Sequence, residues 1–108
     1  MTQVKVVVFV PLTHTDIVRK AIGEAGGGII GNYNNCTFST KGVGRFLPMD
    51  GAHPAIGGVG KLEEVHEEKI EFVCSREEAK NILAIIKKVH PYEEMALDIY
   101  PLINEEEL

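Results

Sequence analysis

Residues 90–93, HPYE, place an imidazole, a phenol and a carboxylate close together. His90 with Glu93 or Glu94 could act as an acid–base pair or as two metal ligands, because imidazoles and carboxylates transfer protons and bind divalent metals. A structural alternative exists, since the residue before Pro91 avoids helical geometry, and a cationic His90 would stabilise the carbonyls at a helix end. Tyr92 could then cover that end. We favour this structural interpretation and assign no catalytic residue.

Residues 31–36, GNYNNC, form the second candidate site. Glycine and asparagine supply left-handed backbone and free amide donors, as an anion-binding turn requires. The layout of a phosphate loop is missing, because the segment leads into a strand and not into a helix. A sharp chain reversal is the alternative that we favour. A ligand at this segment would contact Asn32, Tyr33 and Cys36.

Cys36 brings thiol chemistry to the chain. As a nucleophile it needs a nearby base, and as a metal ligand it needs nearby imidazoles, for which His53, His66 and His90 are available. No closely spaced CxxC or HxxxH pair pre-forms such a site. A structural thiol is the common alternative. The candidate metal ligands are therefore Cys36, His90 and Glu93, with no cofactor identified.

The segment 50–60, DGAHPAIGGVG, is a long loop with four glycines and contains His53. Small residues permit close backbone approach, so the loop could form a ligand lid or pack at a cleft between subunits. The acidic stretch at 63–71 is expected to be a solvated strand face. Glu64, His66 and Glu68 would share that face only in a regular strand.

Length and charge restrict the function classes. A chain of 108 residues is long enough for one domain, which we place at 1–104, with 105–108 as a solvated acidic tail. A net charge of −5 and the lack of a basic stripe argue against a nucleic-acid partner. No apolar run approaches the roughly 20 residues of a membrane span. Without a signal peptide, and with cysteines that show no pairing pattern, we expect reduced thiols and a cytoplasmic protein.

Hydrophobic patterns predict six elements. A β-branched run at 4–10 predicts a buried central strand, and helical spacing follows it up to the glycines at 26–28. The predicted start of this helix is the N-cap chemistry of 13–16. Next come two short strand segments around a turn at Lys41–Gly42.

The second half of the chain predicts a strand, a helix and a strand. The strand between 61 and 74 changes parity between Val65 and Ile70, which predicts a bend or bulge near 66–68. Ser75 and Glu78 form a capping box that starts the second helix. The order is that of a ferredoxin-like βαββαβ sandwich, an α+β fold with two helices on one face of an antiparallel sheet.

Three stretches together resemble the YqfO group of the Nif-three-like family: GIIGNYNNCTFSTKGVGRF, GAHPAIGGVGKLEEVHEEKIEF and HPYEEMALDIYPL. The match covers roughly residues 4–102 and corresponds to the segment that longer members carry in the middle of the chain. That segment is similar in fold to the trimeric PII and CutA proteins. The resemblance therefore implies a PII/CutA-like domain standing alone and a tendency to trimerise. The two-metal site of the longer members lies in a flanking domain and cannot be carried over to any residue here.

Two departures from the family are visible. Relatives often have Asn at the position of His53, which argues against a role that needs an imidazole there. They often have Pro at the position of Met95, which affects only how the last strand begins.

Three hypotheses remain open. The leading one is a non-enzymatic PII/CutA-like assembly module that forms a homotrimer and binds a small molecule or a protein at subunit clefts.

 In that hypothesis the apolar contacts come from Tyr33, Phe38, Phe46 and Ile56, and the loops 31–35 and 51–60 line the clefts. The second is an enzyme or metal protein in which Cys36, His53, His90 and Glu93 converge across subunits. The third is a regulatory partner of a separate metal-binding domain of the same family.

Overall fold

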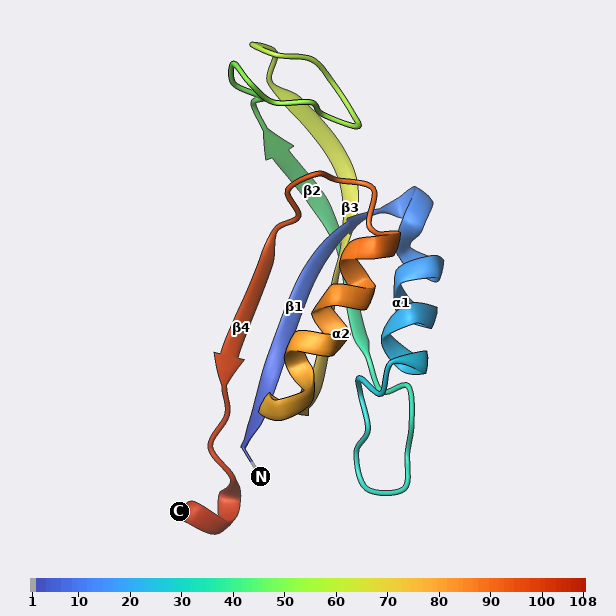
Figure 1. The fold of residues 1–108 in the computed structure, drawn as a ribbon, viewed down its shortest axis with the longest axis vertical. Coiled ribbons are helices and arrows are strands. Elements are labelled where there is room, and N and C mark those ends of the chain that lie inside the picture. Colours follow the sequence, from blue (N-terminus) through green and yellow to red (C-terminus); the bar gives the residue numbers. More distant parts are fainter. Residues whose placement is uncertain (1) are drawn as a thin grey trace.

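The computed structural model describes residues 2–108 and contains one four-stranded antiparallel sheet with two helices (Figure 1). The strands lie in the order β2-β3-β1-β4. Their bounds are Gln3–Pro11 for β1, Phe38–Phe46 for β2, Glu63–Ser75 for β3 and Leu97–Pro101 for β4. The helices are α1, Thr15–Glu24, and α2, Arg76–Val89, with short 3-10 turns η1 at Leu12–His14 and η2 at Glu105–Glu107. The predicted ferredoxin-like fold is confirmed.

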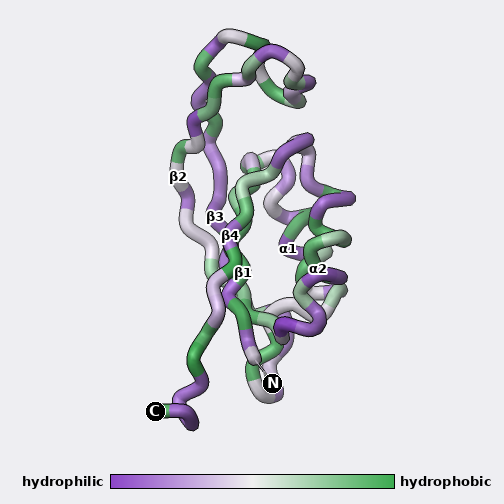
Figure 2. Tube along the Cα trace, turned by 60° about the vertical axis from the view of Figure 1, so that its left-hand side comes forward, coloured by the Kyte–Doolittle hydropathy of each residue, from purple (hydrophilic) through white to green (hydrophobic). Residues whose placement is uncertain are grey.

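Both helices cover the same face of the sheet, and the core lies between the two layers (Figure 2). β1 is the central contributor, because alternate residues of a strand point to the same face and four of its valines point at the helices. The valines are Val4, Val6, Val8 and Val10. Val18 and Ile22 of α1 meet them, as do Ile82 and Ile86 of α2. Burial of each such side chain contributes about 1.5–3 kcal/mol to stability.

The helix boundaries confirm one predicted cap and correct another. The Ser75 hydroxyl accepts a hydrogen bond of 3.3 Å from the Glu78 N–H, as the capping box predicts for the start of α2. The N-cap of α1 is His14, and its side chain makes no cap hydrogen bond. Here the 3-10 turn η1 leads directly into the helix, and Thr15 uses its hydroxyl to bond the Leu12 carbonyl.

The turn predicted at Lys41–Gly42 is wrong. β2 is one continuous strand, and its register with β3 runs unbroken from Phe38 opposite Glu71 to Phe46 opposite Glu63. A long partner strand stabilises this pairing and overrides the local turn preference of glycine. The chain reverses instead in the segment 47–62, which connects β2 to β3 and is called the arm below.

The bulge predicted near residues 66–68 is also wrong, because β3 pairs regularly with both neighbours. The parity change has another cause. Ile70 and Phe72 face the helices, whereas nearer the start of β3 Glu67, which pairs with the last residue of β1, Pro11, is buried on the opposite face. Different faces of one regular strand are therefore buried in its two halves.

The arm extends the molecule along its longest axis, which measures 49 Å against 26 Å and 23 Å for the other two (Figure 1). Hydrogen bonds of 3.0 Å from the Ala52 N–H to the Met49 carbonyl and of 2.8 Å from the Gly60 N–H to the Pro48 carbonyl shape it. Among residues 2–108, no helix is long and apolar enough to cross a membrane.

Candidate ligand-binding cavity

The residues proposed from the sequence fall into two groups at opposite ends of the sheet. His53, His90, Tyr92 and Glu93 gather where the arm meets the segment between α2 and β4. The segment with Asn32, Tyr33 and Cys36 lies at the other end (Figure 1). A single copy of the chain therefore does not bring the three candidate metal ligands together.

The first group centres on His90, whose side chain is only 7% exposed. Its Nε2 lies 2.8 Å from the Phe9 carbonyl oxygen, which can only accept, and its Nδ1 accepts a hydrogen bond of 3.1 Å from the Tyr92 N–H. These partners define a neutral imidazole protonated at Nε2. Burial lowers the pKa of His90, although the Phe9 carbonyl and the Glu67 carboxylate oppose this effect.

The expected cationic His90 at the end of α2 is therefore wrong. Both ring nitrogens are already hydrogen-bonded within the chain, so neither is free to bind a metal or accept a proton from a substrate. His90 instead connects the end of α2 to β1 and fixes the backbone of Tyr92. Its role is structural, as the sequence favoured, but by a different mechanism.

Tyr92 connects this network to Glu67, a residue that the sequence did not single out. The Tyr92 hydroxyl donates a hydrogen bond of 2.9 Å to Glu67 Oε2, and its ring packs edge-on against Phe46 at 5.7 Å. Burial and the bond to Glu67 raise the pKa of Tyr92. Glu67 is 8% exposed and lies over Gly44, where a Cβ atom would collide with its carboxylate. Glycine at this position thus makes room for the buried acid.

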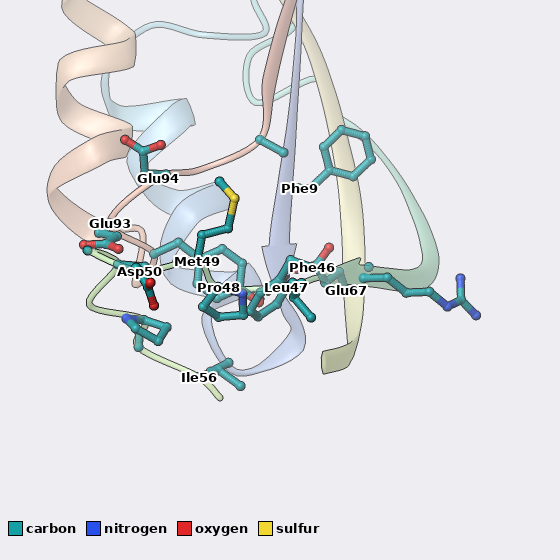
Figure 3. Close-up of a pocket in the computed structure, with 18 residues that line it drawn as sticks. Phe9, Phe46, Leu47, Pro48, Met49, Asp50, Ile56, Glu67, Glu93 and Glu94 are labelled. Carbon is teal, nitrogen blue, oxygen red and sulfur yellow. Dashed lines mark hydrogen bonds between the residues drawn. The ribbon is translucent and has the colours of Figure 1, made fainter. Parts of the chain in front are cut away.

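A cavity of about 750 Å³ opens beside this pair (Figure 3). It lies on the sheet face opposite the helices, because Phe9, Phe46 and Glu67 all point to that face. The arm supplies a wall with Leu47, Met49 and Ile56. A volume of this size is typical of small-molecule sites.

The arm is attached to the rest of the cavity through His53. Its backbone N–H donates a hydrogen bond of 2.8 Å to Glu93 Oε1, across 40 residues of sequence. The backbone and not the imidazole makes this contact, which agrees with the expectation that position 53 has no need of histidine. Glu93 thereby holds the arm against the segment that carries Tyr92.

The polar groups of the cavity are mainly carboxylates, contributed by Asp50, Glu67, Glu93 and Glu94. In the described part of the chain no Ser, Thr, Cys or Lys side chain lines the cavity. No group of three His, Cys, Asp or Glu side chains among residues 2–108 is arranged to hold a metal ion. The arrangement combines carboxylates with apolar side chains, which suits the binding of a ligand.

The second group forms a chain reversal between α1 and β2. The Gly28 N–H bonds the Val73 carbonyl and the Cys36 N–H bonds the Gly28 carbonyl, both at 2.8 Å, which closes the segment into a loop. Asn35 adopts the left-handed φ of 58° that the sequence suggested for an asparagine here. Tyr33 is 76% exposed near the tip. The favoured chain reversal is confirmed for this segment.

The acidic face of β3 is regular, so Glu64, His66 and Glu68 do share one side of the strand. Glu68 pairs with Arg19 at 2.8 Å, and Glu64 pairs with Arg45 at 3.3 Å. These carboxylates form ion pairs at the surface and do not surround a common point.

Comparison with known proteins shows which proteins the chain resembles. No protein-family model matches the chain. It is 54% identical over 103 residues to the GTP cyclohydrolase 1 type 2 homolog of Halalkalibacterium halodurans, a match that covers 95% of this chain and 28% of that protein. The Bacillus subtilis protein of the same name is 49% identical over 98 residues, covering 91% and 26%. A solved Bacillus cereus protein related to NIF3 superimposes with a TM-score of 0.83 at 47% identity, covering 95% and 26%.

The chain is related to the Nif-three-like proteins. It spans about a quarter of the length of the curated relatives that it matches. The Archaeoglobus fulgidus CutA protein matches this chain with a TM-score of 0.69 at 15% identity, covering 98% of this chain and 91% of its own. Bacillus subtilis GlnK matches with a TM-score of 0.63 at 17% identity, covering 94% and 86%. At these identities the likeness concerns the fold alone, and it shows that the chain has the PII/CutA-like architecture.

Proposed function

We propose that the chain is a non-enzymatic, PII/CutA-like binding module that forms a homotrimer and takes up a ligand in the cavity beside Tyr92. The observation that carries this proposal is the arm, which projects from an open sheet and presents apolar side chains to solvent. Four of them are at least half exposed: Leu47, Met49, Val59 and Leu62. Exposed apolar groups gathered on a projecting segment are typical of an interface.

The sheet itself supports the same conclusion. β2 and β4 are its outer strands, and in the described chain neither has a second strand on its outer side. An unpaired edge is prone to pair with another chain unless something covers it. The arm and the outer edge of β2 on one copy can meet the β4 edge of the next. Such head-to-tail contacts close into a ring when the rotation allows, and three copies are the number that the family resemblance implies.

The names of the curated relatives suggest an enzymatic alternative, GTP cyclohydrolase chemistry, for the longer proteins. This chain matches only about a quarter of those proteins, and no group of three His, Cys, Asp or Glu side chains among residues 2–108 is arranged to hold a metal ion. We therefore assign binding to this module. A metal or catalytic site formed between copies, with Cys36 of one copy near His53 or Glu93 of another, stays a prediction, as does regulation of a separate metal-binding domain.

Native mass spectrometry of the purified chain tests the proposal. We expect a mass about three times that of the 11.9 kDa protomer. Leu62→Asp places a charge on the arm, where it would be buried in an interface, and we expect the complex to dissociate at least about 10-fold more readily. Ile17→Asp is the matched control, because Ile17 is also exposed but lies on α1. A monomeric wild type would refute the proposal, and so would a Leu62→Asp protein as fully trimeric as the control.

A further inference from the structure

Glu67 combines burial with an oxygen that has no partner in the chain. Its Oε2 accepts the bond from Tyr92, but Oε1 receives no hydrogen bond from the described residues, and the side chain lines the cavity. No buried side-chain nitrogen or oxygen among the described residues lacks a hydrogen-bond partner, so the unpartnered Oε1 keeps contact with the open cavity. Oε1 is therefore an acceptor that a ligand in the cavity can reach, held in place by the bond between Oε2 and Tyr92.

The cationic residue that lines the cavity is already paired. Arg45 is the single cationic residue among those that line the cavity, and its guanidinium lies 3.3 Å from Glu64. Arg45 and Glu64 are opposite each other in the register of β2 and β3, on the face that also carries Glu68, away from Glu67. The guanidinium of Arg45 thus pairs with Glu64, which is not one of the four carboxylates that line the cavity.

Apolar surface makes up the rest of the cavity. Phe9 and Phe46 come from the sheet, and Met49 and Ile56 come from the arm (Figure 3). A bare inorganic ion would leave these groups unused. An anion, including one that carries phosphate groups, would approach four carboxylates without a free cation to offset the repulsion.

We propose that the cavity binds a small organic cation, whose protonated amine, amidine or guanidinium group pairs with Glu67 and whose apolar body packs between Phe9, Phe46 and Met49. This inference rests on the proposed binding function and specifies the ligand class of that site. Asp50, Glu93 and Glu94 add a negative field that attracts such a ligand. An amidine or guanidinium suits the site best, because its planar pair of N–H donors matches a carboxylate.

Three probes of one shape and different charge test the proposal: benzamidine, neutral benzamide and anionic benzoate. Each is titrated into ¹⁵N-labelled protein in the presence of EDTA, and ¹H–¹⁵N shifts are followed at residues 44–56 and 92–96. We expect benzamidine to bind with a Kd of about 1 mM, at least about 10-fold more tightly than benzamide or benzoate. Higher salt should weaken the binding of benzamidine.

Glu67→Gln keeps the side-chain shape and can still accept the bond from Tyr92, but it lacks the charge. We expect it to weaken benzamidine binding at least about 10-fold. Glu71→Gln is the matched control, because Glu71 lies on the same strand and the same face but does not line the cavity. We expect no change in affinity for this control.

Several results would overturn the proposal: no benzamidine shifts up to about 20 mM, equal affinity for benzoate or benzamide, or unchanged affinity in a folded Glu67→Gln protein. The three probes on the wild type keep the test decisive even if Glu67→Gln fails to fold. Native masses of the same samples separate the two proposals. A trimer that does not bind benzamidine refutes only the ligand class, whereas a monomer refutes the trimer whatever it binds.

Discussion

The hydrogen bond between Tyr92 and Glu67 offers the sharpest test of how the cavity is built. Tyr92→Phe removes only the hydroxyl, since the ring keeps its edge-on contact with Phe46. The carboxylate of Glu67, 8% exposed, then loses its one hydrogen-bond donor among the described residues. The variant therefore isolates the cost of leaving a buried acid without that donor.

The expected magnitude follows from the burial and charge of the pair. A hydrogen bond to a charged group contributes about 1.5–3 kcal/mol, and we expect Tyr92→Phe to lower the free energy of unfolding by about 2 kcal/mol. With an unfolding entropy of about 2.1 cal/mol/K per residue, a chain of this length would lose about 9 °C in Tm. The same substitution in a Glu67→Gln background should cost about 1 kcal/mol or less, because a neutral amide is a weaker acceptor.

Urea unfolding of the wild type, the two single variants and the double variant measures this coupling. All four proteins must be compared at one protein concentration, since assembly shifts apparent stability. Tyr100→Phe is the control, because Tyr100 is 53% exposed and makes no side-chain hydrogen bond within the described chain. We expect it to change stability by less than about 0.5 kcal/mol. A coupling energy near zero would show that the bond between Tyr92 and Glu67 does not contribute, and the account of the cavity would fail.

Two further predictions concern His90 and the chain reversal. Burial holds the pKa of His90 below its ordinary value of 6.5, so the unfolded chain takes up the proton first and stability is lost as the pH falls below about 6.5. The urea midpoint should therefore drop between pH 7.5 and 5.5, and drop less in His90→Gln; an equal drop in both would contradict it. At Gly28, φ is +81° and a Cβ atom would collide with the Cys36 backbone, so Gly28→Ala should cost at least about 2 kcal/mol. Gly58→Ala, where a Cβ atom meets open space, should change stability by less than about 1 kcal/mol, and similar losses in both would refute the packing argument.

Local patterns were sufficient for the core and the element order. The β-branched run became β1, and the capping box at Ser75 marked the start of α2. Both signals depend on neighbouring residues alone, and tertiary structure here reinforces them. The turn at Lys41–Gly42 failed for the opposite reason. The signal for this turn is also local, but β2 pairs with residues of β3 that are far away in the sequence, and this pairing decides the structure.

Glu67 shows why the site was only half predictable. It sits in an acidic stretch that suggests a solvated surface, and its burial depends on Gly44 and Tyr92, both more than 20 residues away. One signal in the sequence did point to it. The parity change between Val65 and Ile70 is typical of a bend or bulge, but a regular strand that changes its buried face produces the same pattern. If the strand changes its buried face, Glu67 is the acidic residue that lies on the buried face near the start of β3.

The residues of HPYE matter more for the contacts that they make within the fold than for the reactions that their side chains could carry out. His90 uses both ring nitrogens to fix the backbone at Tyr92, Tyr92 orients Glu67, and Glu93 holds the arm through the His53 backbone. Three of these contacts join residues distant in sequence: His90 with Phe9, Tyr92 with Glu67, and Glu93 with His53. The His90 imidazole is the group whose chemistry most suggests catalysis, yet both of its ring nitrogens are used in hydrogen bonds within the chain. The free acceptor lies on Glu67, the residue that those contacts hold in place, and it is therefore the atom at which a ligand should be sought.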